Sequence, residues 1–161
     1  MIADMKSNGS EQALEWHWRR MDEMSVAYLY EMLALRESIF VVEQRCVYLE
    51  LDGLDESALH LVANHKDGMV ACLRLLNCSA DEGPVRLGRV AVSKRFRGQG
   101  LARLMMKKAI EKVRQDYPDR ELQLSAQTYL QSFYQSLGFT LCGEEFIEDG
   151  IPHLPMVMMP V

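Results

Sequence analysis

The sequence lacks several features that mark membrane, secreted and metal-binding proteins. Among its 161 residues, the longest apolar runs, such as Leu137 to Cys142, are far too short to cross a bilayer. The first residues lack the apolar core of a signal peptide, so we expect a cytoplasmic protein that does not bind membranes. The four cysteines include no C-x-x-C pair, and neither a zinc site nor a disulfide framework is therefore expected.

An excess of positive charge is absent as well. The formal net charge is −5, which argues against general nucleic-acid binding because such binding usually needs a basic surface. The composition is that of an ordinary globular protein, and no repeat or compositional break divides the chain. We predict one domain over residues 13–161, preceded by a mobile arm, residues 1–12, that shows no hydrophobic periodicity.

What is present is a mixed order of strand and helix patterns. Residues 14–20 alternate apolar and polar side chains as a half-buried strand does. Ser25 is a candidate N-cap for a helix whose apolar residues recur at helical spacing as far as Phe40. Asp67-Gly68 is a strong hairpin signal between two strands. Later patterns predict a strand at 85–92, a helix at 100–115, a strand at 122–126, a short helix at 130–137 and a hairpin turning at 148–150.

This order predicts an α/β (α+β) fold in which helices pack on a mixed sheet. The strand, helix and strand between residues 85 and 126 should form a right-handed parallel crossover. The turn before that helix then lies at the carboxyl end of a strand, which is the usual ligand crevice of an open α/β sheet.

Two further groups of residues have a predicted environment. Cys72 lies inside an apolar run and is expected in the core. Cys46 lies in a polar connection, where we expect an unreactive loop residue that can be exposed. The apolar residues 156–159 can pack either in the core or at a contact between two copies, which leaves a homodimer open.

The most informative stretch runs from Val90 to Arg103. An apolar strand pattern, residues 90–92, leads into a basic turn with two glycines and then into a long amphipathic segment. The start of a helix offers unpaired N–H groups and a positive dipole end, and both attract anions. A side chain at Gly98 or Gly100 would block close approach of a ligand to the backbone. The stretch therefore predicts a cradle for a pyrophosphate.

Two common phosphate-binding loops do not fit this stretch. A Walker loop needs G-x-x-x-x-G-K-S/T, and the sequence contains none. A dinucleotide fingerprint needs a third small residue, and Arg103 stands at that position. A nicotinamide-dependent enzyme therefore stays only as a weak alternative.

A third interpretation rests on resemblance to a family. Residues 97–102 fit the pattern Q/R-x-x-G-x-G/A and are similar to the acetyl-coenzyme A signature of the GNAT N-acetyltransferases, with Ala102 where many relatives carry Gly. Residues 127–139 resemble the second hallmark of that family, an amide residue followed by a short helix that carries Tyr and then Gly-Phe. The likeness runs from about Leu14 to the C-terminus. Segments that look like the ElaA-type branch of the family are 35–44, 52–55, 60–61, 87–90 and 149–153.

The resemblance implies a GNAT fold, with a mostly antiparallel sheet of about six to seven strands and a central parallel strand–helix–strand unit. It also implies acetyl-coenzyme A as co-substrate and no metal. In this family the backbone of the strand and the turn binds the cofactor, and we expect the Val92 N–H to polarise the thioester carbonyl. The residues whose backbone is expected at the cofactor are Val90, Ala91, Val92, Gly98, Gln99, Gly100, Leu101, Ala102 and Arg103.

Side chains complete the expected cofactor site. The Arg97 side chain, and that of Arg103, can add positive charge for the phosphates. Gln127 occupies the amide position after the strand and would hold the pantetheine or a phosphate. Tyr134 is the candidate general acid, whose phenol would protonate the departing thiolate.

The acceptor side carries fewer signals. An attacking amine must lose a proton, because the pKa of an alkylammonium group is near ten. Glu43 is a candidate base, and its alternative role is a solvated carboxylate that caps a turn. His60, His153 and Arg89 are candidates for binding the acceptor, with Asp149 as a further charged group.

These observations predict an N-acetyltransferase that moves the acetyl group of acetyl-coenzyme A to a primary amine of a small molecule or peptide. Transfer would occur by direct attack in a ternary complex, since no Cys or Ser stands in a convincing nucleophile–base motif. The alternative is a non-catalytic module that keeps the fold and binds acyl-coenzyme A as a sensor or interaction subunit.

Overall fold

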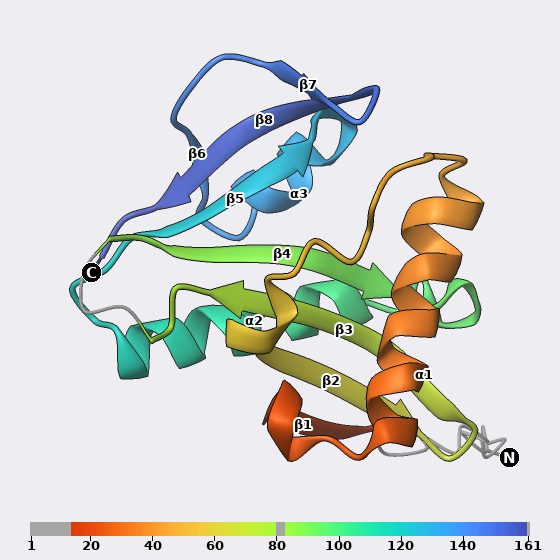
Figure 1. The fold of residues 1–161 in the computed structure, drawn as a ribbon. Helices are drawn as coiled ribbons and strands as arrows, with labels where there is room; N and C mark the ends of the chain where they lie inside the picture. Colours follow the sequence, from red (N-terminus) through yellow and green to blue (C-terminus); the bar gives the residue numbers. More distant parts are fainter. Residues whose placement is uncertain (1–13, 80–82, 161) are drawn as a thin grey trace, which may run out of the picture.

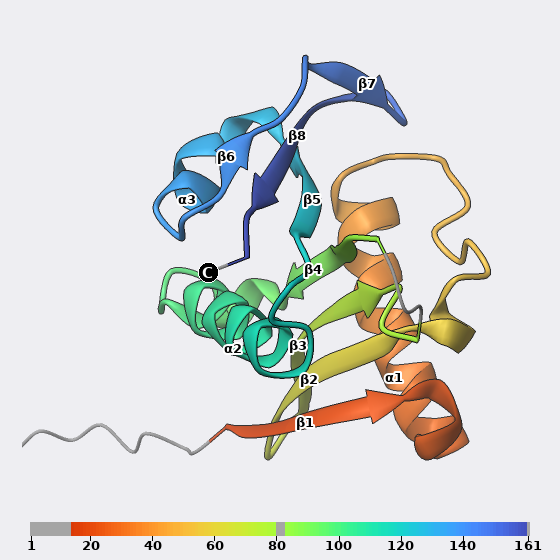
Figure 2. The same ribbon diagram turned by 90° about the vertical axis from the view of Figure 1, so that its left-hand side faces the viewer.

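One mixed sheet organises the chain. The computed structural model describes residues 14–79 and 83–160, so the predicted arm, 1–12, lies outside the described residues. Helices α1 (Val26–Glu37) and α2 (Leu101–Asp116) pack on opposite faces of the first four strands (Figures 1 and 2). The strands, in their order across the sheet, are β1 (Glu15–Arg20), β2 (Leu59–His65), β3 (Gly68–Leu76), β4 (Val85–Val92), β5 (Leu122–Gln127), β8 (Ile151–Met158) and β6 (Thr140–Leu141), with β7 (Phe146–Glu148) also on β8.

The predicted sheet type is confirmed. Each neighbouring pair of strands is antiparallel except β4 and β5, which are parallel and are joined through α2. Over the described residues the sheet has eight strands, against the expected six to seven. The difference lies in β6 and β7, two- and three-residue segments that are too short to show a periodic pattern in the sequence.

Local signals account for most element ends. Ser25 caps α1, since its Oγ accepts a hydrogen bond from the Tyr28 N–H at 3.2 Å. Gly68 has a φ of +118° at the predicted hairpin between β2 and β3. The first helix does not continue in α-form to Phe40 as expected, because residues Ser38–Glu43 form a π-helical turn. Turns of this kind are rare overall, but those that occur are often found at functional sites. The end of this one lies near β4, since Phe40 and Glu43 line the same cavity as Val92.

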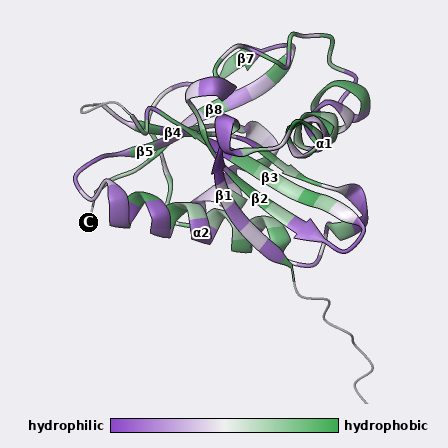
Figure 3. Ribbon diagram, turned by 60° about the horizontal axis from the view of Figure 1, so that its bottom comes forward, coloured by the Kyte–Doolittle hydropathy of each residue, from purple (hydrophilic) through white to green (hydrophobic). Residues whose placement is uncertain are grey.

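The core lies on both faces of the sheet. Under α2, large buried side chains such as Met105, Met106 and Phe139 pack against the strands, while Met32 of α1 packs over Cys72. The expected core position of Cys72 is therefore confirmed. Figure 3 shows hydrophilic and hydrophobic residues alternating along α2, as expected for a helix with one buried face. In the C-terminal group, Met156, Val157 and Met158 are buried and Met159 is exposed.

The parallel pair β4–β5 separates after two residues. Only Val85 with Leu122 and Arg86 with Gln123 are paired, and beyond them the strands diverge (Figure 1). A bulge accompanies the separation, since the register of β3 and β4 shifts opposite Arg89, which has a φ of +53°. The consequence is an opening in the middle of the sheet.

None of the helices in the described part of the chain is both long and apolar enough to cross a membrane.

Candidate active site

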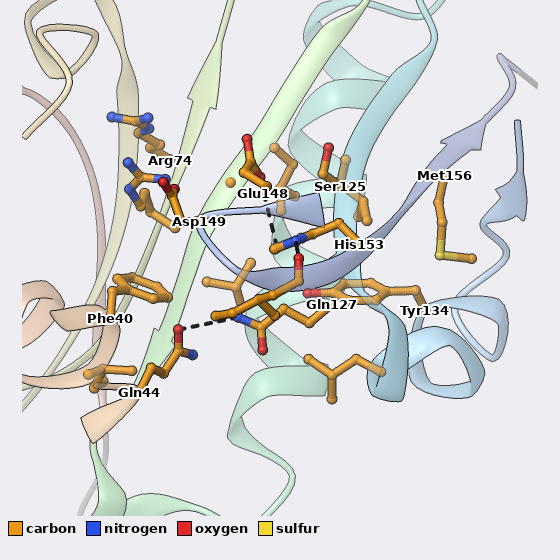
Figure 4. A pocket seen from close by; sticks show the side chains of 18 of the residues that line it. Phe40, Gln44, Arg74, Ser125, Gln127, Tyr134, Glu148, Asp149, His153 and Met156 are labelled. Atoms are coloured by element: carbon orange, nitrogen blue, oxygen red, sulfur yellow. Dashed lines mark hydrogen bonds and ion pairs between the residues drawn. The ribbon is translucent and has the colours of Figure 1, made fainter. Parts of the chain in front are cut away.

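A cavity of about 1060 Å³ lies where β4 and β5 separate. Its walls come from the π-helical turn, residues 44–52, helix α3 (Gln131–Gln135) and the turn between β7 and β8 (Figure 4). Segments far apart in the sequence therefore meet here. The predicted site residues that line it are Glu43, Arg89, Val90, Val92, Arg97, Ala102, Gln127, Tyr134, Asp149 and His153.

The main chain of Val92 faces the cavity side of β4. Ala71 on β3 is its partner, and the Ser93 N–H donates to the Val70 carbonyl oxygen at 2.8 Å. In this register Val92 occupies a non-hydrogen-bonded position, so its own N–H and C=O point away from β3. The pairing of β4 with β5 ends well before this level, at Arg86. The Val92 N–H is therefore directed into the opening, where a ligand carbonyl can accept from it.

The turn between β4 and α2 has the backbone that an anion cradle needs. Gly98 and Gly100 have φ values of +74° and +78°, which glycine adopts far more readily than other residues. A Cβ at either position would meet no protein atom within 4 Å, so the space beside both glycines is open. Helix α2 begins at Leu101 without a capping side chain, and its first N–H groups have no intrahelical acceptor. Ala91, in contrast, is buried and paired with Cys72, and by the same alternation its N–H and C=O face β3 and not the opening.

Arg97 and Glu43 form an ion pair at the mouth of the cavity. Both guanidinium Nη atoms of Arg97 donate to the Glu43 carboxylate, one of them at 3.1 Å, and Nε donates to the Val92 carbonyl oxygen at 2.9 Å. The hydrogen bond from Arg97 lowers the pKa of Glu43. A carboxylate held in this way is a weak proton acceptor, so the geometry favours Glu43 as the partner of Arg97 over Glu43 as a base.

The second predicted cation, Arg103, is held against α3. It donates to the Ser136 Oγ at 2.9 Å and its guanidinium lies 5.4 Å from the centre of the Phe133 ring. Arg103 therefore lies at the start of α2, next to the turn that carries Gly98 and Gly100 (the glycine turn).

Tyr134 brings a buried phenol into the cavity. The side chain is 6% exposed and packs edge-to-face against Phe133 and Phe139, which fixes the ring. Figure 4 shows it pointing from α3 toward Gln127 and His153. Burial raises the pKa of Tyr134 to about 12, so the hydroxyl keeps its proton at neutral pH. A protonated phenol in this place can donate to a ligand sulfur or oxygen.

Two hydrogen bonds cross the cavity from the segment after the π-helical turn. Gln127 Nε2 donates to Gln44 Oε1 at 3.3 Å, and Cys46 Sγ donates to the Asp149 carbonyl oxygen at 3.0 Å (Figure 4 shows the first). Cys46, whose exposure the sequence left open, is 8% exposed, because this contact turns it toward the β7–β8 turn. The two bonds join the segment after the π-helical turn to β5 and to the β7–β8 turn, across the opening between β4 and β5.

A buried ion cluster supports the segment 46–58 behind the cavity. Arg36 of α1 is 1% exposed and forms paired hydrogen bonds with both Glu50 and Asp55, at 2.5–3.1 Å. Arg74 of β3 donates to Asp55 at 3.0 Å and also pairs with Asp52. The guanidinium groups lower the pKa of Asp55 despite its burial. The cluster thereby holds a segment with little regular structure in place.

Arg89 extends this cluster to the cavity. Its Nε donates to Glu50 at 2.7 Å and its guanidinium lies near the rings of Phe40 and Tyr48. The Arg89 guanidinium is therefore already bound to other side chains of the protein. The sequence analysis missed the structural role of Arg36 and Arg74. For Arg74 a signal was present, since a lone arginine inside the apolar run of β3 needs a buried partner.

His60 does not take the place expected for it. The ring is 1% exposed, its Nε2 lies 3.2 Å from the Asp55 carbonyl oxygen, and the residue is not part of the cavity lining. Burial lowers the pKa of His60, which favours the neutral ring. The structure gives it a place beside the ion cluster and no contact with a ligand in the cavity, because its position on β2 is two strands away from the opening.

The described residues contain no evident metal-binding site. Within residues 14–79 and 83–160, no group of three or more His, Cys, Asp or Glu side chains could hold a metal ion.

Comparison with known proteins gives a consistent result. The family model described as "Acetyltransferase (GNAT) domain" matches residues 30–160. Protein ElaA of Escherichia coli is 41% identical over 145 residues, covering 89% of this chain and 95% of that protein. A UPF0039 protein of Synechocystis is 39% identical over 145 residues, with coverage of 89% and 94%.

Solved structures agree. An acyl-CoA N-acyltransferase from Pseudomonas aeruginosa is 39% identical with a TM-score of 0.85, covering 91% of this chain and 99% of that one. The crystal structure of E. coli ElaA is 40% identical with a TM-score of 0.85 and the same coverage. Together with the separated parallel strands, the tyrosine of α3 in the cavity between them and the glycine turn after β4, these matches show that the chain belongs to the GNAT acetyltransferase family and resembles its ElaA branch.

Proposed function

We propose that this protein transfers the acetyl group of acetyl-coenzyme A to a primary amine of a small molecule or peptide, by direct attack in a ternary complex. The observation that carries the proposal is the joint position of the Val92 N–H and the Tyr134 phenol in one cavity, beside a glycine turn. The name of the similar Pseudomonas aeruginosa protein, an acyl-CoA N-acyltransferase, supports the same reaction class.

The residues of the site fit acetyl-coenzyme A. The open space at Gly98 and Gly100 and the first N–H groups of α2 suit a pyrophosphate, with Arg97 close by. The backbone of β4 at Val90 and Val92 would pair with the pantetheine arm, and Gln127 offers an amide across the opening. When bound, acetyl-coenzyme A supplies an acetyl group activated as a thioester.

The chain itself supplies two contributions to the reaction. The Val92 N–H stabilises the negative charge that develops on the carbonyl oxygen as the amine attacks, because it already points into the opening. Tyr134 donates its hydroxyl proton to the leaving sulfur, and its raised pKa keeps that proton available. Burial raises the pKa of Cys72 to about 12, so this core thiol does not serve as a nucleophile.

Coenzyme A release tests the proposal directly. The full chain is incubated with acetyl-coenzyme A and a panel of primary amines, amino acids and a lysine-containing peptide, and free thiol is measured together with the mass of the acetylated product. We expect acetylation of at least one amine, and no acetylated protein in the absence of acceptor. Binding of coenzyme A without turnover on any acceptor would instead favour a non-catalytic module.

A thermal-shift assay checks the choice of nucleotide. Because a ligand that binds only the folded state raises Tm, acetyl-coenzyme A should raise Tm and NADH should not. A shift with NADH alone contradicts the proposed co-substrate.

A further inference from the structure

We propose that His153 is the general base that takes the proton of the acceptor amine. The inference rests on the proposed function and adds to it a residue whose ring orientation, protonation site and position the structure defines. His153 lies on β8 directly across from Gln127 of β5 and lines the cavity. It is also 8% exposed, so it is largely shielded from bulk water.

The hydrogen bond at Nδ1 decides which nitrogen can act. Nδ1 lies 2.8 Å from the Ile151 carbonyl oxygen, which can only accept, so Nδ1 carries the hydrogen. In the neutral ring Nε2 is then the unprotonated nitrogen. The ring stacks on Phe146, with centroids 5.9 Å apart and an angle of 26° between the planes. These two contacts fix the orientation of the imidazole. In known catalytic sites a third group commonly orients the general base in the same way.

A carboxylate stands ready to stabilise the protonated ring. Glu148 Oε2 lies 3.8 Å from Nε2, close enough to favour a positive imidazolium without occupying Nε2 with a short hydrogen bond. Figure 4 shows Glu148 beside His153, with the Tyr134 phenol directed from α3 toward His153. A base and an acid therefore flank one space.

The other carboxylates of the cavity are less suited to the role. Glu43 is held by Arg97, and the pKa of Asp52 is lowered by its hydrogen bond to Arg74. Glu148 and Asp149 remain, and of these Glu148 is the partner of His153. Glu148 and Asp149 are both exposed, whereas His153 is 8% exposed, so His153 is the base candidate of the lining that is shielded from bulk water and not paired with a guanidinium.

The proposed proton transfers balance. An ammonium acceptor passes one proton to Nε2 and becomes the free amine, whose lone pair forms the C–N bond as the C–S bond breaks. The thiolate takes the Tyr134 proton, the phenolate regains a proton from the nitrogen, and His153 releases its proton to solvent. The sum is one ammonium and one thioester converted to one amide, one thiol and one proton.

The test uses His153→Asn, since the Asn amide can still donate to the Ile151 carbonyl while Nε2 is removed. With the acceptor amine found in the panel, we expect kcat/KM for the amine to fall about 100-fold or more at pH 7. The loss should shrink toward pH 10, where amines lose their proton unaided. The affinity for coenzyme A, measured by calorimetry, should change less than twofold. His17→Asn, on β1 and outside the cavity lining, is the matched control.

The tautomer of the His153 ring gives a second, activity-independent measurement. The groups facing His153 are Glu148 of β7, Asp149 of the turn and Tyr134 of α3. Nitrogen NMR of the free protein should show His153 as the Nδ1–H tautomer, because Nδ1 faces the Ile151 carbonyl oxygen. An Nε2–H tautomer, or an unchanged pH–rate profile in His153→Asn, overturns the proposal. A wild-type protein that acetylates no amine overturns the proposed function instead.

Discussion

The glycine turn and the buried ion cluster both adjoin the cavity, but they use their hydrogen-bonding groups in opposite ways. The turn and the start of α2 present main-chain N–H groups, with open space at Gly98 and Gly100. The ion cluster presents side chains only, and each of its arginines, Arg36 and Arg74, is buried and paired with two carboxylates. One region keeps hydrogen-bonding groups open for a ligand, and the other pairs nearly all of them inside the protein, with the buried Arg74 Nε as the exception among the described residues.

The difference separates binding from support. Open main-chain donors contribute little to folding stability, because water satisfies them in the free protein. Paired buried charges hold a segment in place, and removal of one partner leaves the others buried without compensation. Substitutions in the turn should therefore change ligand affinity, whereas substitutions in the cluster should change stability first. The following predictions test this contrast.

The largest effect on stability is expected for Arg36→Met. The change leaves one oxygen each of Glu50 and Asp55 without its donor, while Arg89 and Arg74 keep the other, and we expect a loss of about 3–5 kcal/mol in the free energy of unfolding. Urea unfolding followed by circular dichroism measures it. Arg95→Met is the control, because the pair of Arg95 with Asp67 is exposed and should contribute about 0–1 kcal/mol. Similar losses in both variants would contradict a supporting role for the cluster.

Acid should weaken the same cluster. The pKa values of Asp52 and Asp55 are lowered in the folded protein, so these groups add stability above their ordinary pKa, about 4. That stability is lost as pH falls through the lower folded values. We expect the free energy of unfolding to decrease below about pH 4, and to decrease less in Arg36→Met. Urea titrations between pH 7 and pH 2.5 provide the comparison, and equal slopes in the two proteins contradict it.

Tyr134→Phe should affect catalysis strongly and binding weakly. Without the phenol proton the thiolate leaves unprotonated, and we expect kcat to fall about 100-fold while the affinity for acetyl-coenzyme A stays within twofold. Phe keeps the edge-to-face contacts with Phe133 and Phe139, so Tm should change little. Turnover by coenzyme A release and affinity by calorimetry are measured on the same sample. Unchanged turnover removes Tyr134 from the reaction.

Gly100→Ala should weaken cofactor binding beyond its effect on the fold. An alanine at a φ of +78° costs about 1–2 kcal/mol in stability, and its Cβ enters the space proposed for the pyrophosphate. Gly83→Ala is a matched control, with a φ of +86°, equally open space and a position before β4, at the opposite end of that strand from Gly100. Both variants should lose similar stability, and only Gly100→Ala should lose affinity for coenzyme A. Equal affinities would place the phosphates elsewhere.

The smallest effect is expected for Glu43→Gln. The change frees Arg97 from its carboxylate, and we expect the affinity for coenzyme A to rise roughly two- to fivefold at low salt and less at high salt. Glu111→Gln, an exposed position farther along α2, controls for the change in net charge. Calorimetry at 20 and 300 mM salt measures both. If instead the transfer rate collapses with its pH dependence, Glu43 is the base.

Much of the donor side could be predicted because its signals are local. Ser25 caps its helix through a residue three positions away, and the glycines of the turn need their backbone angles regardless of distant contacts. The side chains in and behind the rest of the cavity depend on contacts between positions that are far apart in the sequence. Arg36 meets Asp55 across 19 residues, and Cys46 meets the Asp149 carbonyl across 103. No periodic pattern records such pairs, which is why the burial of Cys46 was left open and His60 was expected in the pocket.

The amino-acid sequence by itself determined the strand–turn–helix segment, since residues 90–103 combine apolar periodicity, two glycines and a helix start, and its resemblance to the family rested on this segment together with residues 127–139. Tertiary structure decided which side chains remain free to act. It pairs Glu43 with Arg97, buries His60 behind the sheet and directs His153 into the opening. The physical reason is that a backbone conformation follows from neighbouring residues, whereas the charge and exposure of a side chain depend on which distant groups the fold places beside it.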